Sequence, residues 1–238
     1  MPTGPSPHQT PDINRIAMAL PLASVAIAAG PALLLVGGVL AGLPSYFAAA
    51  LAVGSMIIAS GAMADDALAD AADGLFGGTT PERRLEIMKD SRHGTYGVAA
   101  LCTFILLRVT ALGAVAAVNP LAAAGIWMAA GVVGRSGALW LAASLPSART
   151  SGVAATAGRL HGRNFAVGTV FAAVLLFVLA GPATSVAGLG AAGLLAVAVI
   201  AGWSALCRHL VGGHTGDLMG ALGALVEVAV LAALLPFV

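Results

Sequence analysis

Long runs of apolar residues, separated by short polar segments, dominate this chain. A helix needs about 20 predominantly apolar residues to cross the hydrocarbon core of a bilayer. Seven stretches meet or nearly meet this length: residues 16–42, 45–64, 95–118, 120–144, 164–181, 184–204 and 217–237. Frequent alanine and glycine would let these helices pack closely in lipid. The pattern predicts an all-α, polytopic transmembrane helix bundle of about seven spans.

The polar segments fall into two sets that a seven-span topology places on opposite sides. Segments near residues 43–45, 118–120 and 181–184 are short and contain no lysine or arginine. The N-terminal tail and segments 65–94, 145–163 and 205–216 form the other set. It holds nine of the eleven basic residues: Arg15, Arg83, Arg84, Lys89, Arg92, Arg149, Arg159, Arg163 and Arg208. The positive-inside rule makes this second side cytoplasmic and the C-terminus external.

Composition supports lipid as the solvent of this chain. Of the 238 residues 59% are hydrophobic and only 9% are charged, whereas soluble domains carry about 25% charged residues. Eleven scattered basic residues are too few for a nucleic-acid-binding patch. Residues 1–14 are polar and proline-rich, which predicts a disordered tail rather than a signal peptide. Residues 15–238 are then a single integral membrane domain.

An acidic cluster follows the second apolar stretch. If the helix of that stretch continues, Asp66, Asp70 and Asp73 recur at i, i+4 and i+7 and share one helical face, while Asp65 points about a quarter-turn away. Three carboxylates on one face repel each other unless a cation neutralises them. Oxygen ligands without cysteine or histidine favour Mg²⁺. The cluster therefore predicts a magnesium site at a membrane edge, and the alternative is a solvated helix end.

The segment after the cluster predicts phosphate handling. Thr80, Pro81 and Glu82 are typical of a helix start, so we expect a short interfacial helix on the cytoplasmic side. At its exit basic, hydroxyl and glycine residues gather, and such groups can hold phosphate oxygens. The alternative is a plain polar loop. The candidate phosphate contacts are Lys89, Ser91, Arg92 and Thr95.

A glycine-rich motif, residues 212–217, precedes the last span. Glycines at a helix start free backbone N–H groups for an anion. Gly213, Thr215 and Asp217 would then form a second wall of the site, with Asp217 ligating a metal or holding an alcohol. The alternative is a glycine loop in which Thr215 caps the helix. We interpret His214 as a polar loop residue rather than a general base.

Charged residues inside the apolar stretches leave two interpretations open. Arg108, Arg135 and Glu227 lie within predicted spans, where ionisable groups are costly and face a polar cavity or each other. They form either a structural Arg–Glu pair or a wall of the active site. Arg149, farther along, serves either as topogenic charge or as a phosphate contact.

Three sequence motifs together resemble those of the cobalamin synthase family, the adenosylcobinamide-GDP ribazoletransferases. They run from Asp66 to Gly74, from Arg84 to Gly97 and from Gly212 to Asp217, and they have the family's order and spacing. The resemblance covers residues 45–238. It implies a Mg²⁺-dependent enzyme of the bacterial cytoplasmic (inner) membrane, with its active site facing the cytoplasm. Such an enzyme joins α-ribazole or its 5′-phosphate to adenosylcobinamide-GDP and releases GMP, completing the cobalamin nucleotide loop.

The resemblance also assigns roles to residues of this chain. It implies that Asp66, Asp70 and Asp73 bind the metal, and that Asp73 or Asp90 accepts the hydroxyl proton. Three positions depart from the family pattern. Ala64 and Ala67 replace a histidine and a glycine, and Ala224 stands where a glutamate is expected.

Two other functions compete with this one. A CDP-alcohol phosphotransferase also uses an aspartate-rich helix and a divalent metal, but Ala71 and Ala72 stand where such enzymes have an arginine. A transporter or a non-catalytic membrane protein of the corrinoid pathway is the other alternative. Transporters place polar groups near the bilayer midplane, whereas these acids lie at an edge. A homo-oligomer or a corrinoid-pathway assembly is left open.

Overall fold

The computed structural model describes residues 12–90, 92–149 and 160–238. Every regular element within these ranges is a helix, and the one β-type pairing there is an isolated bridge between Ser147 and His214. The predicted all-α class is confirmed. The α-helices are α1 (Ile13–Leu40), α2 (Ser45–Ala59), α3 (Met63–Gly77), α4 (Pro81–Ile87), α5 (Thr95–Ala116), α6 (Pro120–Ala138), α7 (Trp140–Ser144), α9 (Gly162–Ala180), α10 (Val186–Val211) and α11 (Gly216–Leu234). Short 3₁₀ turns, η1 (Gly181–Ala183) and η2 (Leu235–Phe237), follow α9 and α11.

Six helical segments in the described ranges are long and apolar enough to cross a membrane, and a bent pair raises the number to seven. The six are α1, α5, α6 with α7, α9 with η1, α10, and α11 with η2. The pair is α2 and α3, whose axes differ by 87°. The expectation of a multi-pass bundle of about seven spans is therefore confirmed.

The second span does not continue straight into the acidic cluster, so that expectation is wrong. Gly61 and Ala62 have positive φ angles, 65° and 57°, between α2 and α3. This left-handed conformation ends α2 and turns the chain, and it is uncommon for a residue with a Cβ such as Ala62. The acids consequently lie on a separate helix, α3. Its first turn carries Asp65 and Asp66, where the helix dipole favours negative charge.

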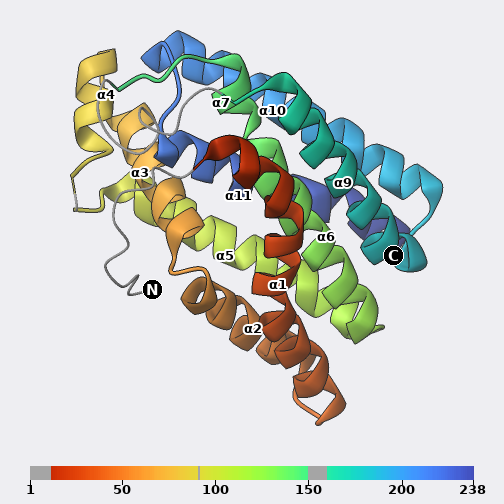
Figure 1. Ribbon diagram of the computed structural model, residues 1–238. Helices are drawn as coiled ribbons and strands as arrows, with labels where there is room; N and C mark the ends of the chain where they lie inside the picture. The colour runs from red at the N-terminus through yellow and green to blue at the C-terminus, as the bar shows by residue number, and fades with distance from the viewer. Residues whose placement is uncertain (1–11, 91, 150–159) are drawn as a thin grey trace, which may run out of the picture.

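Helices α6 and α11 form the centre of the bundle, and α1, α3, α5, α9 and α10 pack around them (Figure 1). Small residues make the central contact possible: a Cβ on Gly134 of α6 would lie 2.5 Å from the carbonyl oxygen of Gly223 on α11. Close backbone approach of this kind is common between helices in lipid. Trp127 of α6 and Leu222 of α11 are fully buried there.

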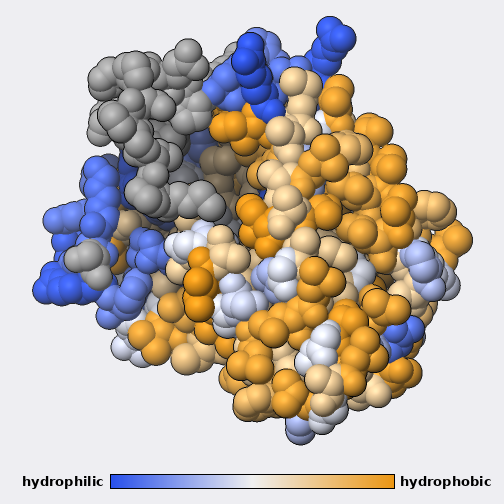
Figure 2. Space-filling model, turned by 60° about the horizontal axis from the view of Figure 1, so that its bottom comes forward, coloured by the Kyte–Doolittle hydropathy of each residue, from blue (hydrophilic) through white to orange (hydrophobic). Residues whose placement is uncertain are grey.

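Hydrophilic residues gather around α3 and α4 on the face of the molecule that Figure 2 shows. In Figure 1, α3 and α4 lie together at the left, and in Figure 2 hydrophilic residues concentrate at the left and top of an otherwise largely apolar face. Helix α4 begins as predicted, because the Arg83 amide donates to the Thr80 hydroxyl at 3.2 Å. Arg84 fixes α4 in place by donating to the carbonyl oxygens of Leu75 (3.2 Å) and Leu210 (3.1 Å).

Candidate active site

The structure brings two of the predicted site segments together in this hydrophilic region. Asp66 is exposed and Asp70 half-buried on α3. The Asp70 carboxylate interacts electrostatically with Asp66, with Asp217 of α11 and, with the opposite sign, with His93. Helices α3 and α11 pack directly against each other. Carboxylates from segments far apart in the sequence thus share one small region, which we call the acidic site (Asp66, Asp70 and Asp217).

Asp73 has a different environment from Asp66 and Asp70. It is buried, and its two carboxylate oxygens accept hydrogen bonds from the Gly94 amide (2.6 Å) and the Gly97 amide (2.8 Å). These amides lie at the N-terminus of α5, where helices leave N–H groups unpaired. A Cβ on Gly94 would lie 2.5 Å from an Asp73 oxygen. Asp73 therefore anchors α5 to α3, and its predicted roles as metal ligand and base stay predictions.

The loop between α4 and α5 carries the predicted phosphate contacts. Lys89 and Arg92 are exposed there, Thr95 is exposed as the first residue of α5, and Ser91 lies outside the described residues. Arg92 forms an ion pair with Asp90, with Nη2 and Oδ2 2.7 Å apart. Hydrogen bonds from Arg92 lower the pKa of the Asp90 carboxyl to about 2. Asp90 is thus a weak base in this arrangement.

The glycine-rich motif forms the turn into α11. Thr215 caps the helix by accepting a hydrogen bond from the Leu218 amide at 3.2 Å, which is the alternative that the sequence left open. Gly213 is buried, and a Cβ there would lie 2.5 Å from the Pro146 carbonyl oxygen. His214 is buried, with Nδ1 3.1 Å and 3.0 Å from the carbonyl oxygens of Leu145 and Pro146. The interpretation of His214 as a loop residue agrees with these contacts.

Arg149 pairs with one acid of the site. Its Nη2 lies 3.1 Å from the Asp217 carboxylate and also donates to the Leu85 carbonyl oxygen at 3.4 Å. From the sequence we interpreted Arg149 as topogenic charge or as a phosphate contact, and we did not predict this ion pair. No helical spacing links the two residues, so only the packed bundle reveals the contact.

Protein side chains alone do not complete a metal site here. Among the described residues, no three histidine, cysteine, aspartate or glutamate side chains are grouped closely enough to hold a metal ion. Mg²⁺ usually keeps several waters and is bound by one or two carboxylates together with substrate phosphates. Asp66 and Asp70, one turn apart on α3, fit that pattern because a phosphate-bearing substrate would supply further oxygen ligands.

The charged residues within the spans form a structural pair deeper in the bundle. Arg108 Nε lies 3.0 Å from Glu227 Oε1, and both side chains are almost completely buried. Asp65, which the helical spacing separated from the other acids, lies 3.6 Å from Arg108 Nη1. The structural-pair interpretation is therefore the one that the structure supports.

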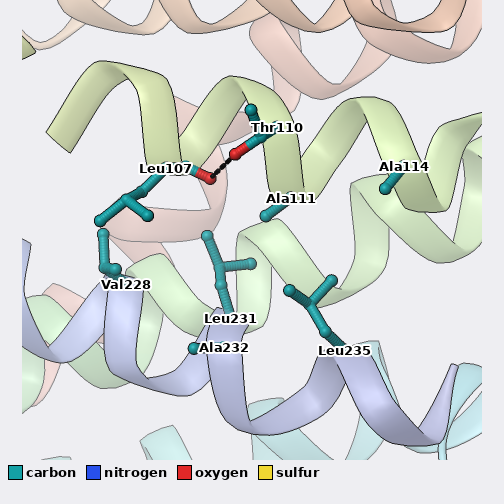
Figure 3. Close-up of a pocket in the computed structure, with 8 residues that line it drawn as sticks. All are labelled: Leu107, Thr110, Ala111, Ala114, Val228, Leu231, Ala232 and Leu235. Carbon is teal, nitrogen blue, oxygen red and sulfur yellow. Dashed lines mark hydrogen bonds between the residues drawn. The ribbon is translucent and has the colours of Figure 1, made fainter. Parts of the chain in front are cut away.

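A groove of about 200 Å³ between α5 and α11 contains no titratable side chain (Figure 3). Its one polar lining residue is Thr110, whose hydroxyl donates to the Leu107 carbonyl oxygen of its own helix at 3.2 Å. A charged substrate would lose its hydration in this groove without gaining hydrogen bonds. The groove is therefore not part of the candidate active site.

Comparison with known proteins places the whole chain in one family. A family model described as cobalamin-5-phosphate synthase matches residues 1–235. Among curated proteins, the adenosylcobinamide-GDP ribazoletransferase of Azorhizobium caulinodans is 44% identical over 223 residues, covering 93% of this chain and 84% of the relative. The proteins of the same name from Sinorhizobium medicae and Brucella ovis are 40% and 35% identical, covering 93% and 100% of this chain and 86% and 91% of the relatives. No solved structure matches the fold significantly. The chain belongs to the cobalamin-5-phosphate synthase family.

Proposed function

We propose that the acidic site carries the transfer reaction of this family, in which ribazole is joined to adenosylcobinamide-GDP. Family membership and the shared name of the relatives give the reaction: the chain is a transferase of cobalamin nucleotide-loop assembly. The observation that supports this location is the meeting of Asp66 and Asp70 with Asp217 in the hydrophilic region around α3 and α4.

The reaction replaces one phosphorus–oxygen bond with another. A hydroxyl of α-ribazole, or of its 5′-phosphate, attacks the phosphorus that links cobinamide to GMP. The bond to GMP breaks, and GMP leaves with the electron pair. Such transfers depend on positioning and on neutralising phosphate charge. The groups that we propose as phosphate and substrate contacts are Lys89, Ser91, Arg92, Thr95, Gly213, Thr215 and Asp217.

The proposed cofactor is Mg²⁺, held by Asp66 and Asp70 together with phosphate oxygens of the substrate. When bound, it would supply positive charge against the pyrophosphate. Asp217 lies at the opposite wall, where Arg149 holds its carboxylate. Asp73 is the third predicted ligand, and its carboxylate accepts hydrogen bonds from the Gly94 and Gly97 amides.

For the proton acceptor, we favour Asp73 over Asp90. Each carboxylate oxygen of Asp73 accepts one amide and keeps a further lone pair, so the group can still receive the substrate hydroxyl. Asp90 is a poorer acceptor near neutral pH because its pKa is about 2. In this proposal Asp90 instead holds Arg92 in the phosphate-binding loop.

The proposed orientation puts the acidic site in the cytoplasm of a bacterial inner membrane. Basic side chains of α4 and of the neighbouring loops lie at the same end as the site: Arg83, Arg84, Lys89, Arg92 and Arg149. The positive-inside rule favours this end as the cytoplasmic one.

The test uses the full-length protein in lipid nanodiscs. Adenosylcobinamide-GDP, α-ribazole 5′-phosphate and Mg²⁺ are supplied, and GMP and the cobalamin product are measured together. Wild type and the control Glu82→Gln, an exposed acid on α4, should form both products in equal amounts. Asp70→Asn should lose at least about a hundredfold in rate, the usual scale for removing one electrostatic contact to a transition state. The proposed location of the reaction is wrong if Asp70→Asn retains wild-type activity.

Product formation from a CDP-alcohol instead of adenosylcobinamide-GDP would favour the competing CDP-alcohol phosphotransferase.

A further inference from the structure

Four charged side chains from four helices gather inside the bundle, away from the acidic site. They are Asp65 of α3, Arg108 of α5, Arg135 of α6 and Glu227 of α11, and we call them the buried charge cluster. Only 4% of the Arg108 side chain, 9% of Asp65 and 10% of Glu227 are exposed. Such residues are rare inside membrane bundles, because removing their charges from water is costly. Their presence calls for a functional reason.

Arg108 is the centre of the cluster. It lies 3.0 Å from Glu227 and 3.6 Å from Asp65, so one guanidinium joins α5 to both α3 and α11. Trp127 of α6 donates its indole N–H to Glu227 at 3.1 Å. The Arg108 guanidinium also lies 4.8 Å from the centre of the Phe104 ring, a cation–π distance. The Arg108 guanidinium is thus surrounded by the carboxylates of Asp65 and Glu227 and the aromatic ring of Phe104.

The charges of the cluster balance. Two carboxylates, Asp65 and Glu227, face two guanidinium groups, and Arg135 interacts electrostatically with Asp65. Arg108 Nε, Arg135 Nη1 and Asp65 Oδ1 are nevertheless buried without a hydrogen-bond partner among the described residues, so Arg108 is held to the two carboxylates by charge. An ion cluster that satisfies its members incompletely contributes little net stability. Stability alone therefore does not account for it.

The position of the cluster relative to the acidic site suggests what it does. Asp65 directly precedes Asp66 on α3, and Glu227 lies on the same helix as Asp217. Between these levels α3 and α11 touch without space for an added atom: a Cβ on Gly220 would overlap Ala67. The two helices that bear the acidic site are thus held together at two heights, by an apolar contact and by Arg108.

We propose that the buried charge cluster positions the acidic site: Arg108, by binding Asp65 and Glu227 at once, fixes the acidic face of α3 against the start of α11. The members of the cluster are positioning residues and do not contact the reactants. The inference rests on the proposed location of the reaction. Small displacements at a reacting centre are costly, since a shift of about 1 Å lowers a rate about a hundredfold.

The test is a double-mutant cycle in nanodiscs with GMP release as the readout. Glu227→Gln and Asp65→Asn keep the size of the side chain and remove one charge each. Arg108→Lys keeps the positive charge and removes the planar guanidinium group. Each should lower kcat by about tenfold to a hundredfold, with the KM for α-ribazole 5′-phosphate unchanged. In an Asp66→Asn background, Glu227→Gln should lower the residual rate by less than about threefold, because the face that it positions is already disabled.

Leu35→Ala is the matched control for lost stability, since Leu35 is fully buried on α1. It should lower the Tm and leave kcat unchanged at temperatures well below the Tm. An unchanged kcat in folded Glu227→Gln and Asp65→Asn would overturn the proposal. An equal loss from Glu227→Gln in both backgrounds would overturn it too. Full activity of Asp66→Asn alone would contradict the proposed location of the reaction. The kcat of the single variant Glu227→Gln, compared with that of wild type, then still decides whether the cluster acts on the reaction.

Discussion

At the scale of single residues, the four aspartates of the acidic motif have four different environments. Asp65 turns inward to Arg108, Asp66 is exposed, Asp70 is half-buried among other acids, and Asp73 anchors the start of α5. Because a helix turns about 100° per residue, neighbouring positions of one motif face different surroundings. The chemistry of a motif therefore depends on what each of its faces meets in the packed bundle.

Asp90 provides a prediction about pH. Arg92 lowers the pKa of Asp90 to about 2, so Asp90 stays ionised at all pH values above about 3 and protonates only below that. An acidic limb of the rate profile near neutral pH cannot come from this group. Asp90→Asn should leave the position of that limb unchanged and change the rate less than Asp73→Asn does. Rates of GMP release between pH 5 and 9 check this, and loss of the acidic limb in Asp90→Asn would contradict it.

The helical spacing of residues 66–73 correctly predicted a helix and a shared direction for Asp66 and Asp70, because local periodicity determines which residues share a face. It could not predict that Asp73 binds amides of α5 or that Arg149 pairs with Asp217. Those contacts depend on tertiary packing between segments far apart in the sequence. Thr215 as a helix cap was one of two interpretations that the local sequence left open, and the hydrogen bond from the Leu218 amide shows the cap.

At the scale of elements, two tight junctions determine where the site helices lie. The left-handed turn at Gly61 and Ala62 directs α3 away from α2 by 87°, and no hydropathy pattern reveals such a break. Asp73 then ties α3 to α5 through Gly94 and Gly97, and the absence of side chains at these glycines lets its carboxylate reach the backbone. The bundle can therefore hold a short polar helix at its edge.

Gly97→Ala tests the second junction. A Cβ at this position would overlap Asp73 and lie 3.0 Å from the Ala69 carbonyl oxygen, so Asp73 would lose its amide partners. We expect the free energy of unfolding to fall by about 1–3 kcal/mol, the cost of leaving buried polar groups unpaired, and activity to fall with it. Thermal unfolding in detergent and GMP release measure the two effects.

Gly190→Ala is the matched control for that change. Gly190 lies within α10, and a Cβ there would meet no atom within 4 Å. It should keep wild-type stability and activity, because alanine favours a helix interior more than glycine does. If Gly97→Ala behaves like Gly190→Ala, Asp73 does not anchor α5 in the way described.

At the scale of the whole molecule, the face seen in Figure 2 is largely apolar, with hydrophilic residues gathered at its left and top. The start of α1 lies beside the start of α9, since the His161 amide donates to the Asn14 side chain at 2.9 Å. Both helices therefore begin on the same side, as the charge distribution predicted. Hydropathy was sufficient to predict the fold class, but the centre of the bundle, α6 with α11, was not apparent from it.

Reporter fusions test the resulting topology. With α2 and α3 together crossing once, the proposed orientation predicts a cytoplasmic N-terminus and an external C-terminus. Alkaline phosphatase fused after Val238 should be active, and a fluorescent protein fused before Met1 should be fluorescent. If the C-terminal phosphatase is inactive in a fusion that is expressed and inserted, α2 and α3 do not cross the membrane but enter and leave it on the same side.

Whether Asp66 holds Mg²⁺ for the reaction is tested most directly by the dependence of GMP release on Mg²⁺ concentration in nanodiscs. Wild type should require Mg²⁺ for GMP release. In Asp66→Asn the half-saturating concentration should rise at least about tenfold, the scale of losing about 1.4 kcal/mol of binding, while Glu82→Gln follows the wild-type curve. An Asp66→Asn curve that superimposes on the wild-type curve, or full activity of wild type without divalent metal, would contradict this role of Asp66.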